Sequence, residues 1–250
     1  IPYMAAYGDG RVILAKESVS SLRTPPTSGE ERSRETNKLP KGICTVGQRT
    51  ELSAITDPTT ELVIWERSFP RQFQVWLDQL DSSSFQNLRV LIQPDHLPRA
   101  IKPHLDECDI GAGDMRDFLI KDIGELISVF AGITNSRLVD VRLDVISHDA
   151  CWKFHRDWVE RRLLTTYRGP TTEWVHPQYA ERAMSEQKCF TGPVEQLQEN
   201  SVAIFKGSCA SSGKGIVHRS PPIEGSGFKR LLLCLNQQSD VSPEAWSAHL

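Results

Sequence analysis

The spacing of apolar residues changes near Arg137, and this change constrains the fold more than any other feature of the sequence. Over residues 69–80 and 115–130, apolar residues recur every three or four positions, which is the period of a helix with one buried face. From Val139 onward they alternate with polar residues, which is the period of a strand with one buried face. The chain is therefore predicted to be mostly β with α, with helices preceding a sheet.

The first part of the chain is predicted to contain a short buried strand, at residues 62–65, and two helices. One helix begins near Pro70, and the other runs from Asp114, which can cap its start, to Gly132, which can end it. Residues 93–113 are rich in proline and glycine and are expected to form an irregular connection. The apolar stripes of the helices are expected to be buried, the second across the back of a sheet: Phe69, Phe73, Trp76, Leu77 and Leu80, then Met115, Phe118, Leu119, Ile123, Leu126, Ile127 and Phe130.

The rest of the chain is predicted to form many short strands. In residues 139–146, Val141 and Leu143 lie on one face of a strand, and Arg142 and Asp144 lie on the other. Short strands with polar, glycine-rich connections are typical of an antiparallel sandwich or jelly roll. The other predicted strands are residues 153–159, 162–167, 201–205, 215–218 and 228–235, with a looser insertion at 171–199.

A single domain is expected over residues 50–250, preceded by a flexible arm over residues 1–49. The arm is predicted because its stretch rich in Ser, Thr, Pro, Glu and Arg cannot bury enough surface to offset the entropy of ordering it. Within the domain, residues 50–136 are expected to form a helical support region and residues 137–238 the β core. A chain of 250 residues can bury a core without a metal ion or a disulfide.

The net charge and the cysteine content indicate which kind of binding partner and which cellular compartment to expect. The net charge of -3 lacks the basic excess of a nucleic-acid binder, so a small-molecule substrate is expected. The six cysteines are scattered without a C-x-x-C pair, which indicates reduced thiols and a cytoplasmic protein. No apolar run approaches the roughly 20 residues needed to span a membrane. Residue 1 is Ile rather than Met, which leaves room for a targeting segment upstream.

A metal site is predicted at His155 and Asp157, which stand two residues apart in a segment expected to be a strand. Side chains at i and i+2 of a strand share a face, so both would point into the space that the sheet encloses. One more imidazole, for which His218 is the candidate, would complete a two-histidine, one-carboxylate triad that leaves open positions on Fe(II). A second H-x-D, at His104 and Asp106, lacks flanking strand pattern and is not expected to bind metal.

The order of these residues resembles that of the Fe(II)/2-oxoglutarate-dependent oxygenases. Those proteins carry an early H-x-D, a late histidine and a basic residue on the last strand, and here the late histidine follows 63 residues after the early one. The resemblance implies a double-stranded β-helix, or jelly-roll, core flanked by N-terminal helices. It also implies that His155, Asp157 and His218 ligate iron, with 2-oxoglutarate and O2 as co-substrates.

The resemblance further implies that Arg230 binds the distal carboxylate of 2-oxoglutarate. A planar guanidinium matches a carboxylate better than the ammonium group of the neighbouring Lys229. Leu232 stands where some members of the superfamily carry a hydroxyl beside this arginine. We therefore expect Thr165 or Tyr167, on the strand after the H-x-D, to supply a hydroxyl to the co-substrate.

A closer resemblance covers roughly residues 50–236. Four segments, at residues 141–144, 151–157, 162–174 and 217–222, resemble a largely uncharacterised domain-of-unknown-function family of bacteria and fungi. Gly-Pro-Thr-Thr at 169–172 replaces the Gly-Pro-Gly-Thr expected of that family. Fungal relatives are similar to the iron-dependent oxygenase of secondary metabolism that closes an aziridine ring on valine.

The expected activity is oxidation of a small molecule, with a free amino acid such as L-valine as the candidate and hydroxylation or aziridine ring closure as the outcome. Arg142 and Asp144 would bind the charges of the amino acid, and Ile204 and Phe205 would contact its side chain. Two alternatives use the same three ligands. One is a zinc-dependent hydrolase, in which the metal acidifies a bound water, and the other is a cupin-like metal or ligand sensor without turnover.

Overall fold

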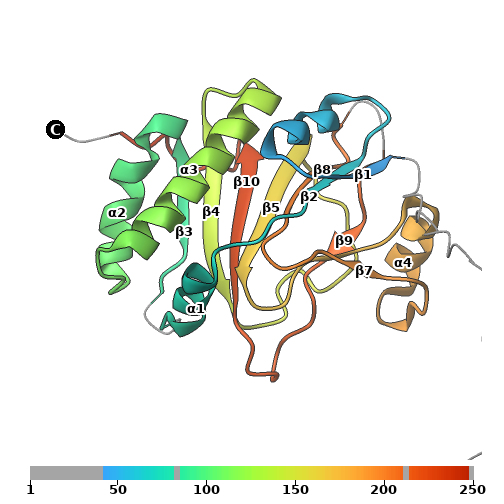
Figure 1. Cartoon of the computed structure of the whole chain (residues 1–250). Coiled ribbons are helices and arrows are strands. Elements are labelled where there is room, and N and C mark those ends of the chain that lie inside the picture. The colour runs from blue at the N-terminus through green and yellow to red at the C-terminus, as the bar shows by residue number, and fades with distance from the viewer. Residues whose placement is uncertain (1–41, 82–84, 211–213, 248–250) are drawn as a thin grey trace, which may run out of the picture. The chain divides into compact units, whose positions relative to one another are not determined.

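Two β-sheets form the framework of the computed structural model, which describes residues 42–81, 85–210 and 214–247 (Figure 1). The major sheet has seven strands in the order β1-β2-β8-β5-β10-β4-β3, and the minor sheet has three in the order β7-β6-β9. The major sheet consists of β1 (Ile43–Val46), β2 (Leu62–Trp65), β3 (Leu88–Ile92), β4 (Val139–Ile146), β5 (Arg161–Arg168), β8 (Val202–Lys206) and β10 (Arg230–Gln237). The minor sheet consists of β6 (Glu173–Trp174), β7 (Glu195–Gln196) and β9 (His218–Arg219).

The chain passes back and forth between the two sheets, which is the topology of a double-stranded β-helix. From β4 it crosses to His155, which bridges to His218 of β9, and it returns to the major sheet as β5. It then forms β6 and β7 in the minor sheet, β8 in the major sheet, β9 in the minor sheet and β10 in the major sheet. The four neighbouring strands β8-β5-β10-β4 are all antiparallel. The predicted jelly-roll core is therefore confirmed.

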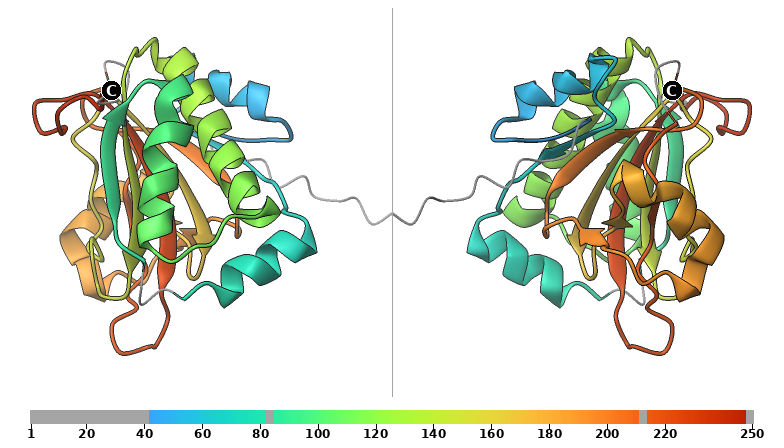
Figure 2. Two further views of the ribbon diagram at one scale, coloured as in Figure 1. Left: turned by 90° about the vertical axis from the view of Figure 1, so that its left-hand side faces the viewer. Right: turned by 90° about the vertical axis from the view of Figure 1, so that its right-hand side faces the viewer.

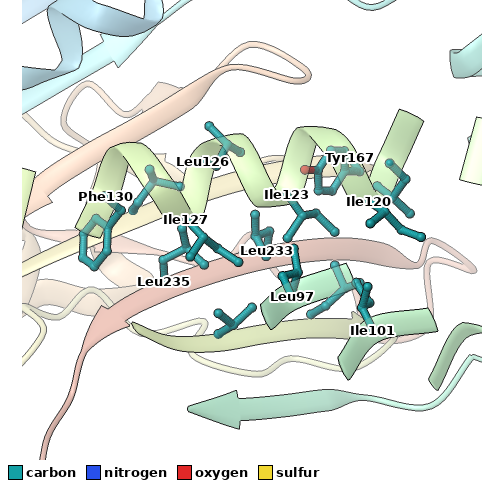
Figure 3. Packing of buried hydrophobic residues seen from close by; sticks show 14 of the residues in the cluster. Leu97, Ile101, Ile120, Ile123, Leu126, Ile127, Phe130, Tyr167, Leu233 and Leu235 are labelled. Atoms are coloured by element: carbon teal, nitrogen blue, oxygen red, sulfur yellow. The ribbon is translucent and has the colours of Figure 1, made fainter. Parts of the chain in front are cut away.

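Helices cover the outer face of the major sheet. The two views of Figure 2 show α2 (Leu97–Glu107) and α3 (Asp114–Thr134) on one side of this sheet, and the minor sheet with α4 (Ala180–Glu186) on the other. The buried stripe of α3, including Ile123 and Ile127, packs with Leu233 and Leu235 of β10 (Figure 3). The predicted position of this helix across the back of the sheet is confirmed. The remaining helices are α1 (Arg71–Gln79) and the short 3-10 helices η1 (Arg49–Thr56), η2 (Pro94–His96), η3 (Pro177–Tyr179) and η4 (Gln187–Cys189).

The alternation along β4 and β10 decides which side chains face the helices and which face the space between the sheets. On β4, Val141 and Leu143 are fully buried in the core under α3, so Arg142 and Asp144 point to the inner face. On β10 the helix side is formed by Leu231, Leu233 and Leu235, and the inner side by Arg230, Leu232 and Cys234. Register pairs Leu232 with Asp144 and Cys234 with Arg142, so these inner residues form one continuous surface.

The prediction of an irregular connection over residues 93–113 is wrong, because residues 97–107 form α2. Leu97, Ile101 and Leu105 recur every four residues and are completely buried, which is the pattern of a helix packed on a core. Pro103 lies inside this helix, where it lacks the N–H of an intrahelical hydrogen bond. Burial of the apolar stripe outweighs that local penalty.

The ends of two other predicted elements also differ from the structure. α3 continues past Gly132 to Thr134, and it ends at Asn135, whose φ of 51° is left-handed and whose N–H bonds the carbonyls of Ala131 and Gly132. Residues 153–159 are not a regular strand, because their only ladder contact among the described residues is the bridge at His155. The predicted insertion at 171–199 contains β6 and β7 and thus supplies part of the minor sheet.

The arm predicted over residues 1–49 lies, up to residue 41, outside the described residues. Residues 43–46, which lie within the predicted arm, form β1 and pair in parallel with β2. Ile43 is buried in the same cluster as Leu62, which explains why this end of the predicted arm is ordered on the sheet. In the described part of the chain, no helix combines the length and apolarity needed to cross a membrane.

Candidate metal centre

His155, Asp157 and His218 converge between the two sheets. His155 and His218 sit directly opposite each other, because each donates its backbone N–H to the other's carbonyl at 3.0 Å, and their ring centroids are 4.6 Å apart. Asp157 Oδ1 lies 3.6 Å from His155 Nε2, and Oδ2 lies 3.2 Å from His218 Nε2. One atom from each residue, all within 4.8 Å of one another, can therefore bind a single metal ion.

Backbone carbonyls orient both imidazoles. His155 Nδ1 lies 2.7 Å from the Lys153 carbonyl, and His218 Nδ1 lies 3.2 Å from the Ile216 carbonyl. Because a carbonyl only accepts hydrogen bonds, each Nδ1 carries a proton, and the Nε2 of each ring faces the carboxylate of Asp157. This is the usual arrangement by which a protein prepares histidine for metal binding.

The carboxylate of Asp157 is held in its charged form. Burial by itself would raise the pKa of Asp157, but the adjacent imidazoles of His155 and His218 and the positive charge of Arg162 hold it well below its ordinary value. Asp157 Oδ2 is buried and has no hydrogen-bond partner among the described residues. Burying an anionic oxygen without a hydrogen-bond donor costs free energy unless a cation lies next to it. This atom therefore favours the binding of a metal ion.

Arg230 is a buried cation without an anionic partner among the described residues. Its side chain is completely buried, and it donates to Ser220 Oγ at 2.7 Å and to Thr172 Oγ1 at 3.2 Å. Within the described ranges no carboxylate forms an ion pair with it, and its Nε has no hydrogen-bond partner. Burial lowers the pKa of Arg230 to about 10, which leaves the guanidinium charged at neutral pH. Such a group is expected to bind an anion supplied from outside the chain.

A cavity of about 280 Å³ joins these groups. It is lined by the imidazoles of His155 and His218 and by Thr172 and Ser220, which accept hydrogen bonds from Arg230. The inner faces of β4, β5 and β10 complete the wall with Arg142, Asp144, Arg162, Leu164, Leu232 and Cys234. The two imidazoles of the triad and the hydroxyls beside Arg230 therefore line the same cavity.

The prediction that Thr165 or Tyr167 contacts a co-substrate is wrong. Because Leu164 faces the cavity, both residues point to the opposite face of β5, under α3. There the Tyr167 hydroxyl donates to Asp122 of α3 at 2.6 Å, and Asp122 also forms an ion pair with Arg67. The hydroxyls beside Arg230 belong instead to Thr172 and Ser220. Ser220 could have been found from the sequence, since it stands two residues after His218 on the same face.

The four residues predicted to bind substrate are divided between two faces. Arg142 and Asp144 line the cavity and form an ion pair at 3.1 Å. The ring of Phe205 lies 4.5 Å from the ring of His218, on the cavity side of β8. Ile204 lies on the opposite face of β8, in the core under α3, so the structure contradicts its predicted contact with substrate.

The second H-x-D, at His104 and Asp106, has other partners in the structure. Both residues lie on α2, where His104 Nε2 contacts the Gln86 carbonyl at 2.8 Å and Asp106 forms an ion pair with Arg116. Within the described ranges, His155, Asp157 and His218 are the only group with metal-binding geometry.

The sequence profile of a family described as "Protein of unknown function (DUF1826)" matches residues 47–236. No curated protein matches the chain significantly. Among solved structures, the chain is similar to a Pseudomonas putida prolyl-4-hydroxylase, with 11% identity over 75% of this chain and 100% of that one and a TM-score of 0.39. It is similar to the Kdo hydroxylase KdoO, a non-haem Fe(II) α-ketoglutarate-dependent dioxygenase, with 12% identity over 78% and 89% of the two chains and a TM-score of 0.42. It is also similar to a bsmA homologue from Methylobium petroleophilum, with 10% identity over 81% and 97% of the two chains and a TM-score of 0.40.

Proposed function

The chain belongs to the DUF1826 family, whose function is unknown, and we propose that it is a non-haem Fe(II)/2-oxoglutarate-dependent oxygenase that oxidises a small molecule. The observation that carries this proposal is the combination, around one cavity, of a His-Asp-His group and a buried arginine without a carboxylate partner among the described residues. A metal triad alone is compatible with several reactions. The unpaired arginine near the triad indicates that the co-substrate is an anion.

The donor set fits iron. Two imidazole nitrogens and one carboxylate oxygen form the facial triad that non-haem Fe(II) oxygenases use, and this set leaves open positions for other ligands. The buried, unpartnered Asp157 Oδ2 supports a cation at this place. Structural zinc sites, by contrast, are usually closed by a fourth protein ligand, and the described residues offer none.

The surroundings of Arg230 fit a dicarboxylate. Arg230 would bind the distal carboxylate through its planar guanidinium, and Thr172 and Ser220, which line the cavity, hold the guanidinium in place. Leu232 and Leu164 add apolar contacts to the cavity wall. A zinc hydrolase built on the same triad would leave Arg230 without a ligand.

When bound, Fe(II) would supply the oxidative decarboxylation of 2-oxoglutarate by O2 to succinate and CO2, coupled to oxidation of a substrate C–H bond. In a hydroxylation, one oxygen atom enters succinate and the other enters the product. The chain would contribute the positions of both carboxylates, through Arg230 at one end and the triad at the other. Leu164 and Leu232 would add apolar contacts in the cavity wall.

The proposal is tested by oxygen uptake and succinate formation. Protein reconstituted with Fe(II) without oxygen is expected, on addition of O2 and 2-oxoglutarate, to consume O2 and release succinate in equal amounts. The same protein loaded with Zn(II) is the control and should consume none, because Zn(II) has no redox chemistry. Iron-loaded protein that neither takes up O2 nor forms succinate, with any member of a broad substrate panel, would contradict the oxygenase assignment.

We further propose a zwitterionic substrate, with a free α-amino acid such as L-valine as the first candidate. Arg142 and Asp144 present opposite charges side by side in the cavity, and the Arg142 side chain is 44% exposed whereas that of Asp144 is 12% exposed. A carboxylate could bind Arg142 while an ammonium group binds Asp144, so that neither charge is left unpaired on desolvation. Phe205 and Leu232 offer apolar contacts near the triad, where hydroxylation or aziridine ring closure would occur.

L-Valine is therefore expected to stimulate O2 uptake, and Arg142→Ala is expected to weaken this stimulation without loss of Fe(II). A charge-assisted hydrogen bond contributes about 1.5–3 kcal/mol, so the apparent KM for the amino acid should rise roughly tenfold or more. Arg89→Ala is a matched control, because Arg89 pairs directly with Arg142 across β3 and β4 and is similarly exposed, but lies outside this cavity. The substrate proposal is contradicted if every free amino acid in a panel gives only the rate of O2 uptake measured without substrate.

A further inference from the structure

Arg162, the second residue of β5, lies beside the triad without belonging to it. Its side chain lies on the inner face of the strand, in the wall of the metal cavity, and is 21% exposed. Nη1 forms an ion pair with Asp157 Oδ1 at 2.6 Å, and Nε donates to Asn236 Oδ1 of β10 at 2.7 Å. The guanidinium is thus held at two points, and one of them is a proposed metal ligand.

This contact makes the two oxygens of Asp157 unequal. Oδ1 forms the close ion pair with Arg162. Oδ2 is buried, has no hydrogen-bond partner among the described residues and lies 3.2 Å from His218 Nε2. A carboxylate can bind a metal through one oxygen or through both, and a cation paired with one oxygen favours the first mode.

We propose that Arg162 is a positioning residue that restricts Asp157 to one ligating oxygen and so keeps a metal position open for the co-substrate. This inference rests on the proposed function. In an octahedral site the triad occupies three positions, and a 2-oxo acid and O2 need the other three. A carboxylate that bound through both oxygens would take one of these, and chelation of the 2-oxo acid would then be incomplete.

Asn236 helps to hold the Arg162 side chain in place. It accepts the hydrogen bond from Arg162 Nε, and its own Nδ2 lies 3.6 Å from Cys234 Sγ on the same strand. Without Asn236, Arg162 would keep its charge but lose its second point of attachment. A role in charge neutralisation alone would leave Asn236 unimportant, whereas a positioning role predicts that its loss has the same effect as loss of Arg162, only smaller.

The experiment compares Arg162→Leu with wild type in two metal-loaded forms. With Mn(II), the enhancement of water proton relaxation should indicate one bound water fewer in the variant, because Asp157 takes the freed position. With Fe(II), the visible absorption band of a chelated 2-oxo acid should require about 10- to 100-fold more 2-oxoglutarate, the range typical of residues that support metal ligands. Affinity for Mn(II) should be kept, because the ligand set gains an oxygen. A general weakening of the site would lower metal affinity instead.

Three further variants complete the test. Arg162→Lys, which keeps one donor near Oδ1, should recover part of the 2-oxoglutarate affinity. Asn236→Ala should weaken 2-oxoglutarate binding by about fivefold, and it also tests the proposal if Arg162→Leu does not fold. Arg161→Leu is the matched control, since Arg161 is the neighbouring arginine, pairs with Glu160 and should change neither readout.

The outcomes separate this inference from the proposed function. If Arg162→Leu leaves both the Mn(II) water count and the 2-oxoglutarate requirement unchanged, the inference is wrong. It is equally wrong if the variant loses metal and 2-oxoglutarate affinity together. If wild type binds Mn(II) but never chelates a 2-oxo acid on Fe(II), the oxygenase proposal fails, while the Mn(II) water count still decides whether Arg162 restricts Asp157.

Discussion

Replacing His218 with alanine is expected to abolish stoichiometric Fe(II) binding while the protein remains folded. The variant keeps only one nitrogen and one carboxylate of the triad, and the described residues offer no replacement ligand at this place. The fold should persist because its largest core lies on the other face of the major sheet, under α3. Each fully buried Leu or Ile there contributes roughly 1.5–3 kcal/mol, whereas loss of one ring costs about 1–3 kcal/mol.

The measurement is iron content after anaerobic reconstitution, together with a thermal melt of the metal-free protein. His155→Ala and Asp157→Ala should give the same result, since each removes one ligand atom. His148→Ala is the matched control, because His148 lines the same cavity but lies outside the triad, and it should retain iron. Full iron content in the His218→Ala protein would overturn the ligand assignment.

Replacing Arg230 with leucine is expected to raise the requirement for 2-oxoglutarate about a hundredfold. The distal carboxylate would then be buried without a cation, which costs on the order of 3 kcal/mol. Affinity for Fe(II) should stay within a few-fold of wild type, because Arg230 contacts Thr172 and Ser220 rather than the triad. Titration of the iron-loaded protein with 2-oxoglutarate, monitored by succinate formation, measures the effect.

Two further substitutions test whether the effect is specific to the guanidinium of Arg230. Lys229→Leu removes the adjacent cation, which directly precedes β10 and is half-buried, and should leave the 2-oxoglutarate requirement unchanged. Arg230→Lys keeps a charge but loses the planar pair of donors, so it should recover only part of the affinity. An effect of Lys229→Leu without one of Arg230→Leu would mean that the co-substrate does not bind on the inner face of β10.

Local sequence pattern predicted the elements whose burial is strong and regular. The alternation at 139–146 became β4 with the predicted division of side chains between two faces, and the apolar stripe that starts at Met115 became α3. The same reasoning failed for α2, where proline content suggested a loop although Leu97, Ile101 and Leu105 follow a helical period. A proline penalty of about 3 kcal/mol is smaller than the gain from burying three large side chains.

Sequence alone also determined the three candidate metal ligands, because the H-x-D spacing and the position of a late histidine are read along one chain. Their meeting depends on the bridge between His155 and His218, which pairs segments 63 residues apart and which only the tertiary structure contains. Because this bridge aligns the two histidines, residues 153–159 need not form a regular strand to bring them together. One pair of backbone hydrogen bonds is enough to set the two imidazoles face to face.

Tertiary packing sets which of two equivalent faces each strand turns inward, and which distant groups meet there. A period of two places Thr165 with Tyr167 but does not say whether they face a cavity or a helix. The hydrogen bond of Tyr167 to Asp122 on α3 settles that they face the helix. Contacts of Arg230 with Thr172 and Ser220, and of Arg162 with Asp157, arise from packing between separate strands and loops, so no local pattern encodes them.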